Sequence, residues 1–79
     1  MKKEPLNPEL KYVIPLIEKE LKFIELKYPN QKHNLDKWLN IIQEELTESI
    51  VNYNIKKSDA AYSDLISVIA ASVLAFNRR

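Results

Sequence analysis

The amino-acid sequence predicts an all-α protein, a three-helix unit that assembles into an oligomeric helical bundle. The chain of 79 residues contains no glycine, and its four prolines all lie before residue 30. This composition favours long helices over a meander of strands, which would need glycine-containing turns. Apolar residues recur at steps of three or four along three segments, which is the spacing of one helix face. We expect one domain over residues 1–79, with helices at about 8–27, 34–54 and 58–77.

The first predicted helix begins near Asn7 and Pro8, a pair typical of a helix cap followed by a first turn. Pro15 interrupts the apolar pattern, because proline lacks an amide hydrogen and clashes with the preceding turn. We therefore expect either a kink at Pro15 or the true start of the helix there. Residues 28–33, with His33 as a surface residue, are expected to form a loop. The apolar face consists of Leu10, Val13, Ile14, Ile17, Leu21, Ile24 and Tyr28.

The second predicted helix starts after Asn34, a residue that favours helix caps. It should end in a short turn at residues 54–57, after which Ser58 or Asp59 is expected to cap the third helix. The helical spacing of its apolar residues predicts one inward stripe. That stripe consists of Leu35, Trp38, Leu39, Ile42, Leu46, Ile50 and Tyr53.

The third predicted helix is apolar nearly all the way round, since residues 65–76 carry no charge. Such a helix is normally buried on several sides. A membrane span is the competing interpretation, but the uncharged run is shorter than the roughly 20 residues needed and contains Ser67 and Ser72. A chain this short also buries only about 60% of its unfolded surface. We therefore favour burial between subunits of a homodimer or homotetramer.

Charge and cysteine usage restrict the function classes. Acidic and basic residues are mixed along the chain with a net charge of +1, so there is no basic stripe for a nucleic acid polymer. The absence of cysteine removes disulfides and thiolate metal sites, and it fits a reducing cytosol. The charged residues 1–5 are not followed by the apolar run of a signal peptide. We expect a cytoplasmic protein that does not enter a membrane.

An acidic patch on the second helix is the sharpest local feature of the sequence. Glu44, Glu45 and Glu48 fall in one arc about 100° wide at 100° per residue. Like charges at this spacing destabilise an isolated helix by a few tenths of a kcal/mol per pair, so the patch needs a nearby cation. Glu45 lies next to Trp38 at the edge of the apolar stripe, which points Glu45 and Glu48 toward the bundle.

Asp64 is the matching feature on the third helix, where it is the only charge between residues 60 and 76. If the second and third helices pack antiparallel, Asp64 comes within reach of the acidic patch. Such a set of carboxylates selects Mg²⁺, or Mn²⁺. The alternative is a solvated acidic face with Asp64 as a cap or salt-bridge partner. The cations available to neutralise that face are Lys37, Lys56, Lys57, Arg78 and Arg79.

Two segments together resemble the MazG-like branch of the all-α nucleoside triphosphate pyrophosphohydrolases. These segments are WLNIIQEELTE at residues 38–48 and DLISVIAA at residues 64–71. The three glutamates of the acidic patch match the first half of the family pattern, and Asp64 stands where the family has a glutamate. Ser67 departs from the pattern, because it occupies the place of the family's aspartate and is not a charged magnesium ligand. The resemblance covers about residues 35–79.

The resemblance implies a helical bundle that dimerises or tetramerises and hydrolyses nucleoside triphosphates to monophosphates and pyrophosphate. It implies that Glu44, Glu45, Glu48 and Asp64 hold Mg²⁺, with Glu45 and Glu48 also catalytic. Magnesium would neutralise phosphate oxygens, and a carboxylate could orient the attacking water.

Three further residues are candidates for substrate contacts. Trp38 could stack on a base, although a core position is its alternative. Lys56 and Arg78 could reach phosphates from helix ends, with solvated ends as their alternative.

Two other function classes remain open from the sequence. The first is a protein that binds a nucleotide in the same pocket without cleaving it, which Ser67 would permit. The second is an interaction protein whose apolar third helix docks on another protein and whose acids form a solvated face. Magnesium binding separates the second class from the first, and product formation separates the first from the enzyme.

Overall fold

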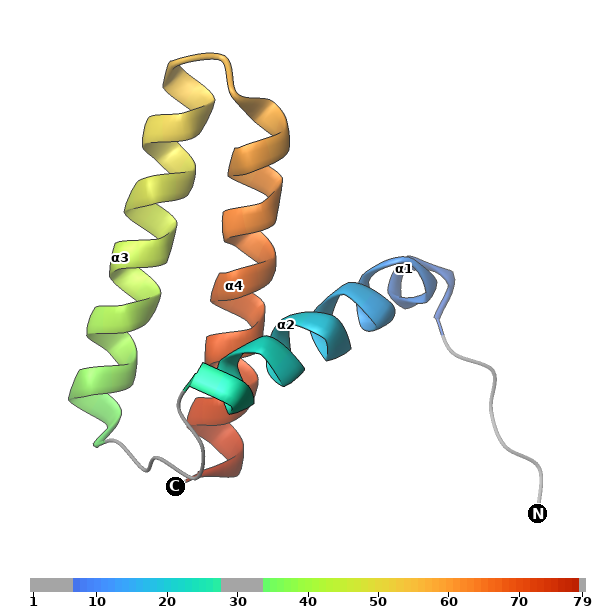
Figure 1. The fold of residues 1–79 in the computed structure, drawn as a ribbon, viewed down its shortest axis with the longest axis vertical. Helices are drawn as coiled ribbons and strands as arrows, with labels where there is room; N and C mark the ends of the chain where they lie inside the picture. The colour runs from blue at the N-terminus through green and yellow to red at the C-terminus, as the bar shows by residue number, and fades with distance from the viewer. Residues whose placement is uncertain (1–6, 28–33, 79) are drawn as a thin grey trace.

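The chain folds as an all-α unit, which confirms the predicted fold class. The computed structural model describes residues 7–27 and 34–78. The predicted loop at 28–33, with His33, and Arg79 lie outside the described residues. The helices of the described part are α1 (Pro8–Lys11), α2 (Val13–Lys27), α3 (Leu35–Asn54) and α4 (Ser58–Asn77) (Figure 1).

The sequence predicts either a kink at Pro15 or the start of the helix there, and the structure shows a break between α1 and α2 shortly before Pro15. The Asn7 side chain caps α1 as predicted, with its Oδ1 accepting a hydrogen bond of 2.9 Å from the Glu9 backbone N–H. The helix is then interrupted at Tyr12, and α2 starts at Val13. Pro15 has no N–H to donate to the carbonyl four residues earlier, so the helix is interrupted in the turn before it.

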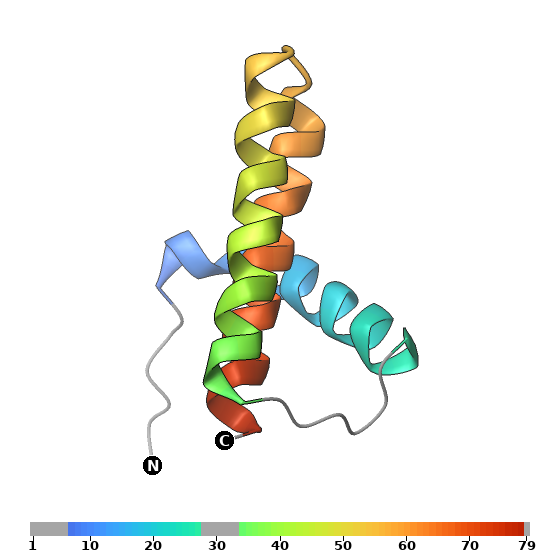
Figure 2. The same cartoon turned by 90° about the vertical axis from the view of Figure 1, so that its left-hand side faces the viewer.

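Helices α3 and α4 form an antiparallel hairpin along their whole lengths, as both views show (Figures 1 and 2). Helix α2 crosses α4, so α4 contacts both of the other long helices. The predicted burial of the third helix on several sides is therefore provided partly by α3 and α2. Even so, only 22% of an 18-residue window of α4 is buried, and the helix is long and apolar enough to cross a membrane by length and composition.

The turn between α3 and α4 has the form of a Schellman motif built without glycine. Lys56 adopts the left-handed conformation, with φ of 65°. The N–H of Lys57 donates to the carbonyl of Asn52 at 2.7 Å, and the N–H of Lys56 donates to Tyr53 at 3.0 Å. These two bonds satisfy carbonyls at the end of α3.

The predicted caps of the two hairpin helices were only partly right. Lys57, and not Ser58 or Asp59, is the N-cap of α4, because the turn ends at Lys57 and helical geometry begins at Ser58. Asn34 does occupy the N-cap position of α3, but its side chain makes no capping hydrogen bond. Its backbone carbonyl instead accepts bonds from Lys37 and Trp38.

The core of the described residues is small. Its centre is Trp38, 4% exposed, packed with Ala71 and Leu74, and Leu21 and Ile24 of α2 cover it from one side. Ala61 and Ala70 are the other buried apolar residues, and no large side chain in the described part is fully enclosed. Small residues let α3 and α4 approach closely but provide little apolar area for the core.

The predicted inward stripe of α3 was wrong in its direction. Trp38 is buried and Ile42 is half-buried, but the other five members of the stripe are exposed. The helix instead turns Ser49 toward α4, where its buried hydroxyl donates to the Ala61 carbonyl at 2.8 Å. The outer stripe of α3, as we name the five exposed members, consists of Leu35, Leu39, Leu46, Ile50 and Tyr53.

Candidate functional site

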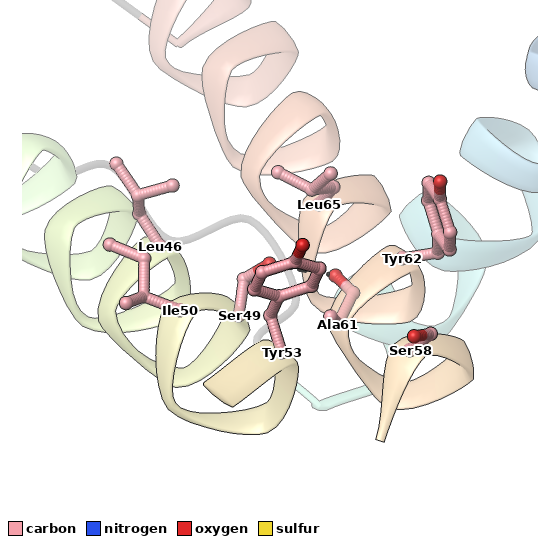
Figure 3. A pocket seen from close by; sticks show the side chains of 8 residues that line it. All are labelled: Leu46, Ser49, Ile50, Tyr53, Ser58, Ala61, Tyr62 and Leu65. Carbon is pink, nitrogen blue, oxygen red and sulfur yellow. Dashed lines mark hydrogen bonds between the residues drawn. The ribbon is translucent and has the colours of Figure 1, made fainter. Parts of the chain in front are cut away.

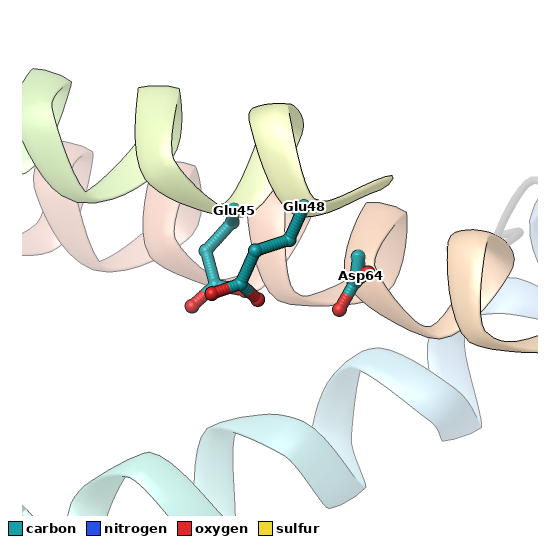
Figure 4. Close-up of side chains that lie close together, drawn as sticks. All are labelled: Glu45, Glu48 and Asp64. Atoms are coloured by element: carbon teal, nitrogen blue, oxygen red, sulfur yellow. The ribbon is translucent and has the colours of Figure 1, made fainter. Parts of the chain in front are cut away.

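Three of the predicted acids meet at the surface between α3 and α4. Glu45 and Glu48 are three residues apart on α3, so they lie on adjacent turns of one face. The antiparallel hairpin brings Asp64 of α4 beside them. One carboxylate oxygen from each residue lies within 4.8 Å of the other two. Figure 4 shows these carboxylates on the side of the hairpin that faces α2.

Asn52 holds the Asp64 carboxylate in place. It follows Glu48 by one helical turn, and its Nδ2 donates a hydrogen bond of 2.7 Å to Oδ2 of Asp64. Asp64 is half-buried, so this bond offsets part of the cost of removing its charge from water. The bond leaves the second oxygen, Oδ1, free of Asn52, and a carboxylate fixed in this way is well placed to bind a ligand.

Helix α2 supplies a fourth acid, Glu20, which the sequence analysis did not identify. Its Oε1 accepts a hydrogen bond of 3.2 Å from the hydroxyl of Ser67, which is also 3.4 Å from the Ser63 carbonyl. Ser67 stands where the family named in the resemblance has an aspartate. The structure places the Glu20 carboxylate of α2 within hydrogen-bond distance of this serine.

The electrostatics of the site act most clearly on Glu45. Partial burial raises the pKa of Glu45 above its ordinary value, and the nearby carboxylates of Glu48, Asp64, Glu20 and Glu44, in that order, raise it further. Burial disfavours the charged form of a carboxyl group, and so do neighbouring negative charges. All the causes of this shift are ones that a bound cation would counteract.

Three of the cations proposed for a solvated face do not neutralise this site. Lys37, Lys56 and Lys57 form no ion pair with Glu45, Glu48 or Asp64. Lys56 and Lys57 are exposed in the hairpin turn before α4, about 10–12 Å from Asp64 along the helix axis at 1.5 Å per residue. Lys37 is exposed two turns before Glu45 on α3.

The remaining predicted site residues lie away from the three converging acids. Glu44 is exposed and is not part of the group, although its charge contributes to the shift at Glu45. Trp38 lies in the core, which was the alternative to stacking on a base. Arg78 follows the last turn of α4, about 20 Å along the axis from Asp64.

Two residues of the site were missed, and for one of them the sequence contains a usable signal. Glu20 comes three residues after Ile17 and four before Ile24, so it lies on the apolar face of its own helix. A charge on such a face is costly unless it has a partner, and it therefore indicates a site. Asn52 gives no comparable signal, because an asparagine near a helix end is common.

Comparison with known proteins gave no match. No protein-family model matches the sequence, and neither a curated protein nor a solved structure matches it.

Proposed function

We propose that this chain is a MazG-like, magnesium-dependent nucleotide pyrophosphohydrolase of the cytoplasm. The single observation that carries the proposal is the convergence of Glu45, Glu48 and Asp64 within 4.8 Å at the α3–α4 surface. These acids come from two helices and have no ion-pair partner among the described residues. Acids arranged in this way destabilise the fold unless a cation or ligand offsets their repulsion, so the arrangement favours a site over a solvated face.

The donor set fits magnesium or manganese. Both ions prefer carboxylate oxygens, and an octahedral magnesium ion takes its ligands at about 2.1 Å. One carboxylate oxygen from each of Glu45, Glu48 and Asp64 lies within 4.8 Å of the other two, so a single ion would be within reach of all three residues. Glu45, Glu48 and Asp64 would hold the ion, and Glu44 would be available from the exposed flank.

The chain's own residues supply the rest of the chemistry. Bound magnesium neutralises phosphate oxygens of the nucleotide. Glu45 and Glu48 are the candidates to orient the water that attacks phosphorus, with pyrophosphate as the leaving group. Asn52 keeps Asp64 in position, and Glu20 of α2 lies beside Ser67, one turn after Asp64 on α4. Lys56, in the turn between α3 and α4, is near enough to reach the phosphate chain of a nucleotide bound at the three acids. Arg78 follows the opposite end of α4.

The test combines metal binding with product formation. Thermal unfolding is measured with and without Mg²⁺, and pyrophosphate release is then assayed with a panel of nucleoside triphosphates. We expect Mg²⁺ to raise the melting temperature and at least one nucleotide to be hydrolysed. Glu45→Gln should lower turnover by about 100-fold or more, as expected when a catalytic carboxyl group is lost.

Glu25→Gln is the matched control, because Glu25 is an exposed acid of α2 outside the site. Its turnover and its response to Mg²⁺ should equal those of the unchanged chain. Absence of any response to metal and nucleotide in the unchanged chain would contradict the proposal and favour the interaction protein.

A non-catalytic nucleotide-binding protein is the second candidate, and Ser67 is the observation that favours it. The serine hydroxyl is hydrogen-bonded to Glu20, so the site has one acid fewer on α4 than the MazG-like pattern. Stabilisation by Mg²⁺ and a nucleoside triphosphate with no release of pyrophosphate would establish this function instead.

A further inference from the structure

A groove between α2 and α4 adjoins the acidic site. The groove has a volume of about 410 Å³, and both helices contribute side chains to it. Glu20 of α2 lines the groove, and its carboxylate is the one that accepts the hydrogen bond from Ser67. Ser63 of α4 also lines the groove and directly precedes Asp64 in the chain. A bound molecule could therefore extend from this groove, which we call the α2–α4 groove, to the three converging acids.

Each wall of the α2–α4 groove exposes an aromatic ring to water. Phe23 of α2 is 60% exposed, and Tyr62 of α4 is 69% exposed. Aromatic rings stack favourably on the flat face of a nucleobase, whichever base it is. The volume of the groove also lies in the range of small-molecule sites, about 300–1,000 Å³. These features favour a planar ring as the occupant.

The polar side chains of the α2–α4 groove supply a donor and an acceptor of hydrogen bonds. Lys19 of α2 offers an ammonium group, and Asp59 of α4 offers a carboxylate. Both side chains are exposed, and they form no ion pair with each other. Guanine has the complementary edge, with a carbonyl oxygen that accepts beside a ring N–H and an amino group that can both donate to one carboxylate. Adenine, cytosine and uracil have no such pair of adjacent donor groups.

We propose that the α2–α4 groove is the base subsite of the nucleotide site and that it selects guanine. This inference rests on the proposed function for the position of the phosphates. Phe23 and Tyr62 stack on the base. Asp59 accepts hydrogen bonds from the ring N–H and the amino group, and Lys19 donates to the carbonyl oxygen. Glu20 lines the groove and lies beside Ser67, where its carboxylate can accept a hydrogen bond from a ribose hydroxyl group.

A second groove, on the hairpin itself, is less suited to a base. It lies close to the turn between α3 and α4, has a volume of about 400 Å³ and is lined by Tyr53 and Leu65 among others (Figure 3). The described residues that line it carry no charge, and the hydroxyl group of Ser49 already donates to the Ala61 carbonyl. This groove therefore lacks the charged donor and acceptor of the α2–α4 groove. Its Tyr53, which is 69% exposed, provides a matched control ring.

Three probes test the base subsite and the acidic site separately on the full chain. Guanosine in a buffer with a metal chelator tests the groove alone, and inorganic triphosphate with Mg²⁺ tests the acidic site alone. Nucleoside triphosphates with Mg²⁺ test both together, as α,β-methylene analogues that cannot release pyrophosphate. Titration calorimetry measures the affinities. We expect the guanosine analogue to bind about fivefold or more tightly than the adenosine, cytidine and uridine analogues, and than the inosine analogue, which lacks only the amino group.

Two variants locate the base in the groove. Phe23→Leu keeps an apolar side chain but removes the ring, so it should weaken binding of the guanosine analogue about fivefold or more. Its affinity for inorganic triphosphate should be unchanged. Asp59→Asn replaces a group that only accepts by an amide, so the guanosine and inosine analogues should then bind about equally. Tyr53→Leu, the matched control, should change none of these affinities.

The outcomes distinguish failure of the base subsite from failure of the proposed function. Binding of inorganic triphosphate with Mg²⁺, together with equal affinity for all the nucleoside analogues, would overturn the subsite and leave the proposed function standing. Binding of guanosine with no response to Mg²⁺ would support the subsite and count against the proposed function. An equal loss of affinity in Phe23→Leu and Tyr53→Leu would show that the base does not bind in the α2–α4 groove.

Discussion

Glu45 is the residue at which the repulsion within the acidic site can be measured directly. Its raised pKa means that the folded protein disfavours the charged form more than the unfolded chain does. The penalty is absent below the pKa of an ordinary glutamate, 4.5, and is complete above the raised pKa of the folded state. In metal-free buffer at neutral pH we expect Glu45→Gln to raise the melting temperature by about 2–4 °C. This shift corresponds to removing a like-charge repulsion of a few tenths of a kcal/mol.

Two conditions should remove this advantage of Glu45→Gln. Acidification below the pKa of the unfolded carboxyl group should abolish it, because the unchanged residue is then protonated in both states. Saturating Mg²⁺ should reverse it, because the unchanged chain gains stability from the ion and the variant gains less. Thermal melts followed by circular dichroism against pH and Mg²⁺ give the comparison. If the melting temperatures of Glu45→Gln and the unchanged chain differ by the same amount at every pH, repulsion at Glu45 is not the cause of the difference.

Ser67 tests whether the site accepts the acid that the MazG-like pattern has. Ser67→Asp places a second carboxyl group beside Glu20, whose oxygen is 3.2 Å from the serine hydroxyl. We expect the metal-free variant to be less stable by about 1 kcal/mol, through a lost hydrogen bond and added repulsion. We also expect its melting temperature to rise more with Mg²⁺ than that of the unchanged chain. Gln43→Glu adds the same charge at an exposed position of α3 and should show neither effect.

At the level of elements, apolar spacing predicted the existence and extent of the helices well, and it predicted their orientation poorly. The bounds of α3 and α4 lie within a residue or so of those expected. The stripe of α3 was assigned inward because Leu39, Leu46 and Ile50 share a face, whereas close packing against Ala61 and Ala71 favoured the face with Ser49. Which side of α3 packs against α4 depends on where the small residues of α4 lie. The spacing of apolar residues within α3 does not contain that information.

The candidate site was likewise predictable where it depends on helical spacing and not where it depends on how the helices pack. The meeting of Glu45, Glu48 and Asp64 was predictable, because helical spacing and an antiparallel hairpin are enough to bring them together. The contribution of Glu20 depends on the crossing of α2 over α4, and that crossing is not encoded in the local pattern of either helix. The direction of the Asn52 side chain likewise depends on where Asp64 lies.

The turn between α3 and α4 contains a local strain that a single substitution should relieve. Lys56 has φ of 65°, a conformation that costs a non-glycine residue about 1–2 kcal/mol. Glycine adopts it without that cost but loses more conformational entropy on folding. We expect Lys56→Gly to stabilise the protein by about 0.5–1 kcal/mol, seen as a higher urea midpoint with an unchanged slope. Lys57→Gly, at φ of −102°, should bring no gain, and an equal gain from both would contradict this explanation.

The whole molecule carries the exposed outer stripe of α3 and the three converging acids on different sides of one hairpin. The expected self-association and the proposed metal binding can therefore be separated in the unfolding transition. If folding is coupled to dimer formation, the melting temperature must rise with protein concentration. With about 2.1 cal/mol/K of unfolding entropy per residue, a tenfold increase should raise it by about 4 °C for a dimer of this size. Mg²⁺ should add a further shift that is the same at every protein concentration, because the proposed metal site and the outer stripe lie on different sides of the hairpin. Differential scanning calorimetry over a range of concentrations measures both shifts. A melting temperature independent of concentration would mean that the small core around Trp38 is enough to fold one chain, and the outer stripe of α3 would then be a surface for a different partner.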